Sequence, residues 1–188
     1  MNGARGMTPS ELSHLTRQEA RHGLTQFEQV YGEARRRPPA SVRQRHAVGA
    51  FHLQLARFVH ARNLGCLLLS PVDVVLDLQR DLVLQPDLLF IASGRTGIIR
   101  ERVLGAPDLV IDVISGRPCL GEIQERLDWY FAYGVREAWV HYQLDQRLEV
   151  LQGGRDRISA RRSFDYCSPI ASMVWPDLTL TPGQILYP

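Results

Sequence analysis

Two apolar segments that carry acidic residues constrain the fold most strongly. Residues 83–94 read VLQPDLLFIASG, and residues 105–116 read GAPDLVIDVISG. Both are rich in Val, Leu and Ile and are bounded by Gly, Pro or Ser, a pattern typical of buried strands. Because a lone buried carboxylate is strongly unfavourable, we expect Asp87, Asp108 and Asp112 to be paired, hydrogen-bonded, metal-bound or placed at a strand end that solvent reaches.

The first third of the chain alternates helical and strand patterns. Residues 8–22 predict a short helix, because the segment opens with a capping box around a proline at the first helical position. Residues 24–37 predict one or two short strands around a glycine, ended by two prolines. Ser41 predicts the N-cap of a long helix, and Gly65 stands where a C-terminal glycine is expected.

Strand patterns dominate the rest of the chain. We predict strands within residues 66–78, 82–92 and 107–115, a helix over residues 120–133, a hairpin over residues 137–152 and further short strands after residue 157. Gly134 is the predicted stop of the helix. This order of elements predicts an α/β fold with a central mixed β-sheet.

The composition agrees with an ordinary globular domain. The chain has 188 residues, of which 45% are hydrophobic and 22% are charged, so we expect one domain over residues 1–188. No apolar stretch approaches the roughly 20 residues that a membrane helix needs, and the N-terminus lacks the apolar core of a secretory signal. We therefore expect a cytoplasmic protein.

All 22 basic residues are arginine, and the chain contains no lysine. This excludes a mechanism that needs a lysine Schiff base or a lysine proton acceptor. The formal net charge of +2 does not by itself indicate a nucleic-acid partner. The cysteines and histidines show no metal-ligand spacing, so we expect them to be structural.

Strand alternation places Asp112 in the middle of a very apolar strand. Alternate residues of a strand share a face, so Asp112 points to the same side as Asp108 and Val110. If the strand that holds Asp87 lies beside this one, Asp87 and Asp112 converge at one edge of the sheet. Their carboxylates are the ligands that Mg²⁺ needs, with water and phosphate oxygens at the remaining positions.

Structural explanations stay open for several of these residues. Asp87 and Asp108 each follow a proline, which is also typical of an acid at a turn or a strand start. Glu122 and Arg126 are four residues apart on the predicted helix and can form a solvent-exposed pair. Because Arg126 lies off the apolar stripe of that helix, it can instead bring a basic group to the acids.

Four segments occur along the chain in a particular order: FEQVYGE at residues 27–33, QPDLLFI at 85–91, GAPDLVIDVIS at 105–115 and YFAYGVREAWV at 130–140. Together they resemble the Uma-two family of restriction endonucleases, within the PD-(D/E)XK nuclease superfamily. The resemblance runs from about Thr8 to the C-terminus. It implies a restriction-endonuclease-like fold, with a mixed central β-sheet flanked by helices.

The resemblance also implies roles for individual residues. Asp87 matches the metal ligand of the PD motif, and Asp112 stands where the family usually has a glutamate metal ligand. The backbone carbonyl of Val113 is a candidate third ligand. Glu28 matches a glutamate of the early strand, close to the metal. Arg126 stands at the position of the family's lysine, which is usually displaced onto the helix.

The implied activity is hydrolysis of DNA phosphodiester bonds, assisted by Mg²⁺ or Mn²⁺ on Asp87 and Asp112. Two departures from the family motif bear on it. Asp112 is one methylene shorter than glutamate, and Arg126 cannot readily act as a general base because its pKa lies above about 12. We expect Arg126 to stabilise negative charge in the transition state instead.

The candidate basic surface for nucleic acid flanks the two prolines at positions 38 and 39. Its residues are Arg35, Arg36, Arg37, Arg43 and Arg45. Such a surface would hold phosphates, so binding would weaken steeply with salt, and nothing in it reads bases. A solvated arginine-rich loop is the structural alternative.

Three functions are compatible with the sequence. The first is a DNA endonuclease that acts as a homodimer, because cutting both strands needs two active sites. The second is a catalytically inactive nuclease-fold protein that serves as a DNA-binding or protein-interaction module, and the third is a domain with no nucleic-acid partner. The first requires a divalent ion at Asp87 and Asp112, whereas the second predicts DNA binding that a chelator does not affect.

Overall fold

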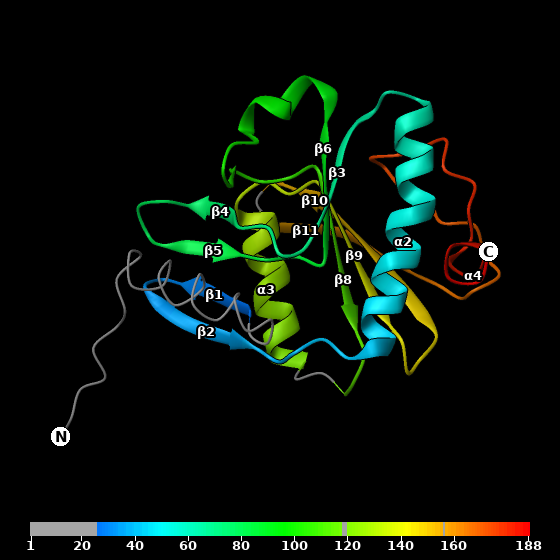
Figure 1. Cartoon of the computed structure of the whole chain (residues 1–188), viewed down its shortest axis with the longest axis horizontal. Helices are drawn as coiled ribbons and strands as arrows, with labels where there is room; N and C mark the ends of the chain where they lie inside the picture. Colours follow the sequence, from blue (N-terminus) through cyan, green and yellow to red (C-terminus); the bar gives the residue numbers. More distant parts are fainter. Residues whose placement is uncertain (1–25, 118–119, 156) are drawn as a thin grey trace.

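A computed structural model describes residues 26–117, 120–155 and 157–188 (Figure 1). The helix predicted over residues 8–22 lies outside this part of the chain. The described elements are β1 (Gln26–Val30), β2 (Glu33–Arg37), α2 (Val42–Ala61), β3 (Gly65–Leu69), β4 (Val74–Asp77), β5 (Leu82–Leu84), β6 (Leu88–Ala92), the 3₁₀ helix η1 (Ser93–Ile98), β7 (Val103–Leu104), β8 (Leu109–Ile114), α3 (Leu120–Ala132), β9 (Glu137–Tyr142), β10 (Arg147–Gly154), β11 (Arg157–Phe164) and α4 (Pro182–Leu186).

The strands form two mixed sheets. The larger sheet has six strands in the order β11-β10-β9-β8-β6-β3, in which β8 and β9 are parallel and joined by α3. The smaller sheet has five strands in the order β2-β1-β5-β4-β7. The predicted α/β class, with a mixed sheet flanked by helices, is confirmed, and the strands are divided between two sheets.

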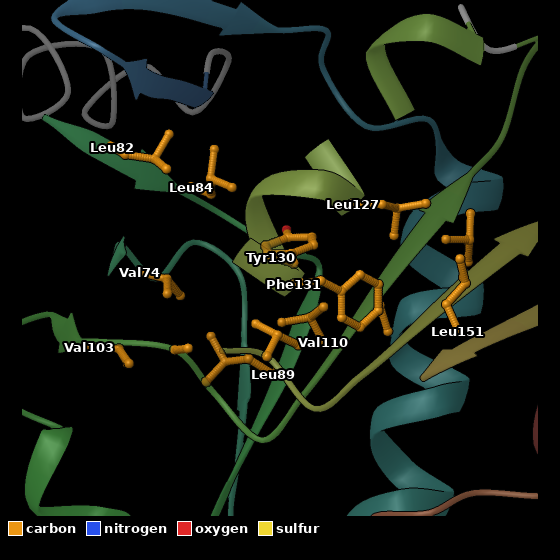
Figure 2. Packing of buried hydrophobic residues seen from close by; sticks show 14 of the residues in the cluster. Val74, Leu82, Leu84, Leu89, Val103, Val110, Leu127, Tyr130, Phe131 and Leu151 are labelled. Carbon is orange, nitrogen blue, oxygen red and sulfur yellow. The ribbon is translucent and has the colours of Figure 1, made fainter. Parts of the chain in front are cut away.

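The two long helices cover opposite faces of the six-stranded sheet (Figure 1). Alternation along β8 divides its side chains between two cores, as the sequence predicts. Val110 packs in the cluster that contains Leu127 and Phe131 of α3 (Figure 2), whereas Leu109 and Ile111 pack in the cluster that contains α2. Residues of the five-stranded sheet also pack in the cluster that contains α3. The face of β8 that carries Asp112 is therefore the one that meets α3 and the five-stranded sheet.

Two predicted strands are each broken by a proline, and at both breaks the chain passes from one sheet to the other. The segment over residues 66–78 breaks at Ser70–Pro71, between β3 of the larger sheet and β4 of the smaller. The segment over residues 82–92 breaks at Gln85–Pro86, between β5 and β6. Proline has no N–H to donate to a ladder, which explains why each strand ends there. Asp87 therefore stands at the junction of the sheets.

The ends of α2 show one correct prediction and one error. The Ser41 side chain accepts a hydrogen bond from the backbone N–H of Gln44 at 3.1 Å and caps the helix, as predicted. Gly65 does not end the helix, because Asn63 takes the left-handed conformation with φ 53°. Gly65 instead begins β3 beside Ile91, where a Cβ would lie 2.1 Å from the Ile91 carbonyl oxygen. No helix within the described ranges combines the length and hydropathy that a membrane span requires.

Glu137, at the start of β9, anchors the C-terminal segment to the sheet. Its fully buried carboxylate accepts hydrogen bonds from Trp139 Nε1 at 2.8 Å, from Ser172 Oγ at 2.5 Å and from the Met173 N–H at 2.5 Å. A buried carboxylate is stable when donors satisfy it in this way. The Glu-x-Trp pattern of the sequence thus has a structural explanation.

His141 is a buried neutral histidine of the α2 core. Its ring contacts Phe51, with 5.5 Å between ring centroids, and its Nε2 lies 2.9 Å from the Tyr166 hydroxyl oxygen. Burial lowers the pKa of His141 from 6.5 to about 4. The neutral form is therefore the one that the fold accommodates, in agreement with the predicted structural role.

His141 makes the stability of the fold depend on pH. Because the folded pKa lies below the unfolded one, protonation favours the unfolded chain as the pH falls from 6.5 towards 4. Between about pH 7 and about pH 4, we expect wild type to lose about 3 kcal/mol more free energy of unfolding than His141→Gln. Urea denaturation across this pH range measures both losses, and equal losses would contradict the prediction.

Candidate active site

Asp87 and Asp112 meet at the sheet junction, as the sequence predicts. β6 and β8 are neighbours, with Leu88 opposite Ile111, so the residue before β6 lies beside the end of β8. The Asp87 N–H lies 3.4 Å from Asp112 Oδ1, and Asp87 Oδ2 accepts a hydrogen bond from the Val113 N–H at 2.7 Å. Both carboxylates are buried and are held next to each other by the backbone.

Glu28 brings a third carboxylate from the five-stranded sheet. It lies on β1, is buried, and its Oε1 accepts a hydrogen bond from the Gln85 N–H at 2.6 Å. Gln85 belongs to the crossing between β5 and β6, two residues before Asp87. One hydrogen bond therefore ties the acid of the smaller sheet to the segment that positions the acids of the larger one.

Arg126 of α3 bridges the acids of the two sheets. Its Nε donates to Asp112 Oδ2 at 2.9 Å, and its Nη1 donates to Glu28 Oε2 at 2.5 Å. The alternative of a solvent-exposed pair with Glu122 is wrong, because within the described residues the ion pairs of Arg126 are with these two buried acids. α3 lies against this face of β8, which turns Arg126 inward.

Arg37, at the end of β2, is the fifth charged member of the site. Its Nη1 donates to the Gln85 carbonyl oxygen, and its Nη2 lies 3.8 Å from Asp87 Oδ1 and 4.0 Å from Asp112 Oδ1. Sequence reasoning placed Arg37 on a basic surface and missed this contact. Alternation in the hairpin around Gly32 could have found it, because the β1–β2 pairing turns Arg37 to the same face as Glu28.

We call Glu28, Asp87, Asp112, Arg37 and Arg126 the acid–arginine cluster. Three carboxylates face two guanidinium groups, which leaves one formal negative charge in excess. Burying this many charges is favourable only because each carboxylate has a cation or a hydrogen-bond donor beside it.

The acid–arginine cluster shifts the pKa values of its two aspartates in opposite directions. Burial, and then the charge of Asp112, raise the pKa of Asp87. Burial alone would also raise the pKa of Asp112, but the charges of Arg126 and Arg37 outweigh it, and this pKa is lowered. Asp112 therefore holds its negative charge more firmly than Asp87 does.

Arg126 and Tyr130 stay protonated inside the site. Burial would lower the pKa of Arg126, but the charges of Asp112 and Glu28 raise it well above its usual value. Burial also raises the pKa of Tyr130 well above its usual value, and its hydroxyl lies 3.3 Å from Asp112 Oδ2. Neither group can take a proton from a reactant, so both act as donors and as positive or neutral partners of the acids.

A cavity of about 560 Å³ opens onto the cluster. Its lining residues are Glu28, Val30, Arg35, Arg36, Arg37, Pro38, Asp112, Ile114, Glu122, Ile123, Arg126, Leu127, Trp129 and Val140. Three of the five predicted basic residues thus form one wall of the cavity that contains the acids. Arg35 pairs with Glu125 at 2.8 Å and lies 5.3 Å from the ring centroid of Trp129.

Three further predicted residues lie away from the cluster. Arg43 and Arg45 are exposed in the first turns of α2 and are not among the residues that line this cavity. Asp108 is a strand-start acid, as expected. Its Oδ2 accepts a hydrogen bond from the Ala92 N–H at 2.9 Å, and its Oδ1 lies 3.0 Å from Arg95 Nη1.

The donor set at Asp87 and Asp112 suits a hard divalent cation. One oxygen of each carboxylate faces the same positively charged nitrogen of Arg37, so the two oxygens already share a point that favours a cation. No group of three or more His, Cys, Asp or Glu side chains within the described residues is arranged to hold a metal ion. A metal ion here would rely on two carboxylates, with water and substrate oxygens, as Mg²⁺ commonly does. The structure shows the N–H of Val113 facing Asp87, and its carbonyl as a ligand stays a prediction.

Two mixed sheets with a helix on each face of the larger one, and acids at their junction, define a restriction-endonuclease-like fold. Among solved structures, the chain is similar to one described as a "putative nuclease belonging to DUF820" from Anabaena variabilis ATCC 29413. The TM-score is 0.73 at 14% sequence identity, covering 85% of this chain and 89% of that chain, which shows a shared fold. The comparison with curated proteins gave no match.

The family model Uma2, described as "Putative restriction endonuclease", matches residues 10–182. The chain therefore belongs to the Uma2 family, and the resemblance found in the sequence is confirmed. The match covers all five members of the acid–arginine cluster.

The bridge made by Arg126 should be a large contributor to stability. We expect Arg126→Met to lower the free energy of unfolding by about 3–5 kcal/mol, because Asp112 and Glu28 would stay buried without their close cation, and the Arg37 guanidinium lies farther away, 4.0 Å from an oxygen of each. Urea denaturation measures the loss. Arg35→Met is the matched control, since its exposed pair with Glu125 should contribute at most about 1 kcal/mol. Similar small losses in both variants would contradict the buried bridge.

Proposed function

We propose that this protein is a metal-dependent endonuclease that hydrolyses phosphodiester bonds of DNA. Membership of the Uma2 family and the nuclease-like fold support the reaction class. The observation that carries the proposal is the meeting of Asp87 and Asp112 at the sheet junction, beside a cavity with an arginine wall. Acids that hold a cation and arginines that hold phosphates are the two parts that such a reaction requires.

Asp87 and Asp112 are the proposed metal ligands, with the Val113 carbonyl as the third. A bound Mg²⁺ or Mn²⁺ would supply positive charge to the scissile phosphate and lower the pKa of a water molecule. The backbone hydrogen bonds of Asp87 and Asp112 orient the two carboxylates before any ion arrives. Such preorganisation is favourable because no reorientation is needed during the reaction.

Arg126 has two proposed roles. It keeps Asp112 ionised and in place through the 2.9 Å hydrogen bond from its Nε. Its Nη2 is buried without a hydrogen-bond partner among the described residues, so a phosphate oxygen that reaches it would satisfy this donor. Arg126 therefore stabilises negative charge in the transition state and takes no part as a base.

The arginine wall is the proposed phosphate-binding part of the site. Arg35, Arg36 and Arg37 line the same cavity as Asp112, so a DNA strand held by them brings its phosphates to the acids. Contacts of this kind make DNA binding weaken steeply as salt rises. Cutting both strands of a duplex takes two such sites, which favours a homodimer as the active form.

One observation favours the alternative, a nuclease-fold protein that binds DNA or another protein without cleaving DNA. The guanidinium of Arg126 is committed to two carboxylates, whereas the family usually has a lysine at this position. A lysine would leave more of the carboxylate oxygens accessible to an ion, because it presents a single point charge. Cleavage assays on the purified protein separate the two functions.

The test of catalysis is nicking of supercoiled plasmid DNA in Mg²⁺ and in Mn²⁺. We expect metal-dependent nicking by wild type and a loss of at least about a hundredfold in Asp87→Ala, because the substitution removes a ligand of the ion. Asp145→Ala is the matched control, since Asp145 is exposed in the β9–β10 turn, and it should cleave like wild type. Thermal unfolding of each variant confirms that the proteins compared are folded.

The same nicking assay is applied to Arg126→Lys. If wild type does not nick DNA and Arg126→Lys does, the protein has the alternative function, that of a nuclease-fold protein that does not cleave DNA, and the loss of catalysis is due to Arg126. Silence in wild type and in Arg126→Lys, combined with DNA binding that EDTA does not change, would contradict a nuclease. Equal nicking by wild type and Asp87→Ala would contradict the assigned site.

A further inference from the structure

We infer that Arg37 is a built-in counter-cation that competes with the divalent metal for Asp87 and Asp112, and that it leaves them when a DNA phosphate enters the cavity. The inference rests on the proposed function and adds a coupling to it. In the free protein Arg37 would weaken metal binding, and in the DNA complex it would hold a phosphate. Metal and DNA would therefore each strengthen the binding of the other.

The contacts of Arg37 place it at the metal position. Its Nη2 lies 3.8 Å from Asp87 Oδ1 and 4.0 Å from Asp112 Oδ1, so one cationic nitrogen faces both proposed ligands. Each separation is longer than a hydrogen bond. The guanidinium is held mainly by the Gln85 carbonyl oxygen, to which Nη1 donates. Arg37 thus neutralises the two acids without being locked to either.

Arg37 is more accessible from the cavity than Asp87 is. Arg37 and Asp112 line the cavity, whereas Asp87 is not among the described residues that line it. The Arg37 side chain is 19% exposed and the Asp87 side chain 9% exposed, so the arginine is the more accessible of the two. An ion that enters through this cavity would therefore meet the positive charge of Arg37 beside Asp112.

Charge makes the two cations compete for the same acids. A divalent ion held by Asp87 and Asp112 would share them with the Arg37 guanidinium, which lies 3.8 Å and 4.0 Å from an oxygen of each, and repulsion between like charges is strong in a partly buried site. A phosphodiester offers Arg37 an anionic partner with two oxygens, which suits a guanidinium. Moving Arg37 from the acids to a phosphate would release the metal site as substrate binds.

The coupling follows from thermodynamic linkage. If DNA removes Arg37 from the acids and so strengthens metal binding, the metal strengthens DNA binding by the same factor. The free protein would then carry little metal, and the site would be completed only with DNA in place. General electrostatic attraction between the metal ion and the DNA would also couple their binding, but that coupling would not depend on Arg37.

The test measures Mn²⁺ binding rather than cleavage. Electron paramagnetic resonance of free Mn²⁺ gives the dissociation constant for wild type, Arg37→Gln and Arg57→Gln, each without DNA and with a short phosphorothioate duplex that resists cleavage. Arg57→Gln is the control for the loss of one positive charge, because Arg57 is exposed on α2 and is not among the described residues that line the cavity. Asp87→Ala shows which binding belongs to the site.

Without DNA, we expect Arg37→Gln to bind Mn²⁺ at least about tenfold more tightly than wild type, and Arg57→Gln to stay within about threefold of it. The duplex should tighten Mn²⁺ binding by wild type and by Arg57→Gln but have little effect on Arg37→Gln. Arg37→Lys is the second variant, in case Arg37→Gln does not fold. A single ammonium cannot hold the Gln85 carbonyl and face both acids, so its Mn²⁺ binding should also be tighter than that of wild type.

Two results would overturn the inference, and they have different meanings. Mn²⁺ binding that depends on Asp87 but is equally tight in wild type and both Arg37 variants would remove the competition and leave the proposed function intact. Absence of Mn²⁺ binding at Asp87 in every protein, with and without DNA, would remove the inference together with the metal-dependent function.

Discussion

The bridge that Arg126 makes between Asp112 and Glu28 is the interaction on which the site depends. It joins an acid of the six-stranded sheet to an acid of the five-stranded sheet through α3, which shares a hydrophobic cluster with both sheets. Because both carboxylates are buried, they depend on this close cation, and the second guanidinium, that of Arg37, lies farther away, 4.0 Å from an oxygen of each. The position of α3, the joining of the two sheets and the ionised state of Asp112 are therefore parts of a single arrangement, and a change in one affects the others.

The same bridge shapes the chemistry that the site can perform. A guanidinium that always keeps its proton provides charge and hydrogen bonds, and it leaves proton transfer to other groups. Arg37 adds a second guanidinium that faces Asp87 and Asp112. Arginine thus supplies the positive charge at both cationic positions of the cluster, in a chain that contains no lysine.

Local patterns predicted most of the elements and part of the site. Ser41 was found as a cap because capping is encoded within a few residues, and the pairing of β6 with β8 brought Asp87 to Asp112 as expected from alternation. Pairing within the β1–β2 hairpin puts Arg37 on the face of Glu28, but the contact of that face with Asp87 and Asp112 depends on how the hairpin docks on β5, a distant segment. The role of Gly65 was missed for the same reason, since Ile91 of a neighbouring strand excludes a side chain there.

The most direct measurement is anomalous diffraction from Mn²⁺ in crystals of the protein bound to an uncleavable DNA duplex. We expect an anomalous peak at the carboxylates of Asp87 and Asp112. The Arg37 guanidinium should be turned towards a phosphate, and Arg126 should still be hydrogen-bonded to Asp112. Saturating Mn²⁺ with no peak at these carboxylates, and Arg37 still facing both of them beside bound DNA, would contradict a metal-dependent nuclease site at the junction of the sheets.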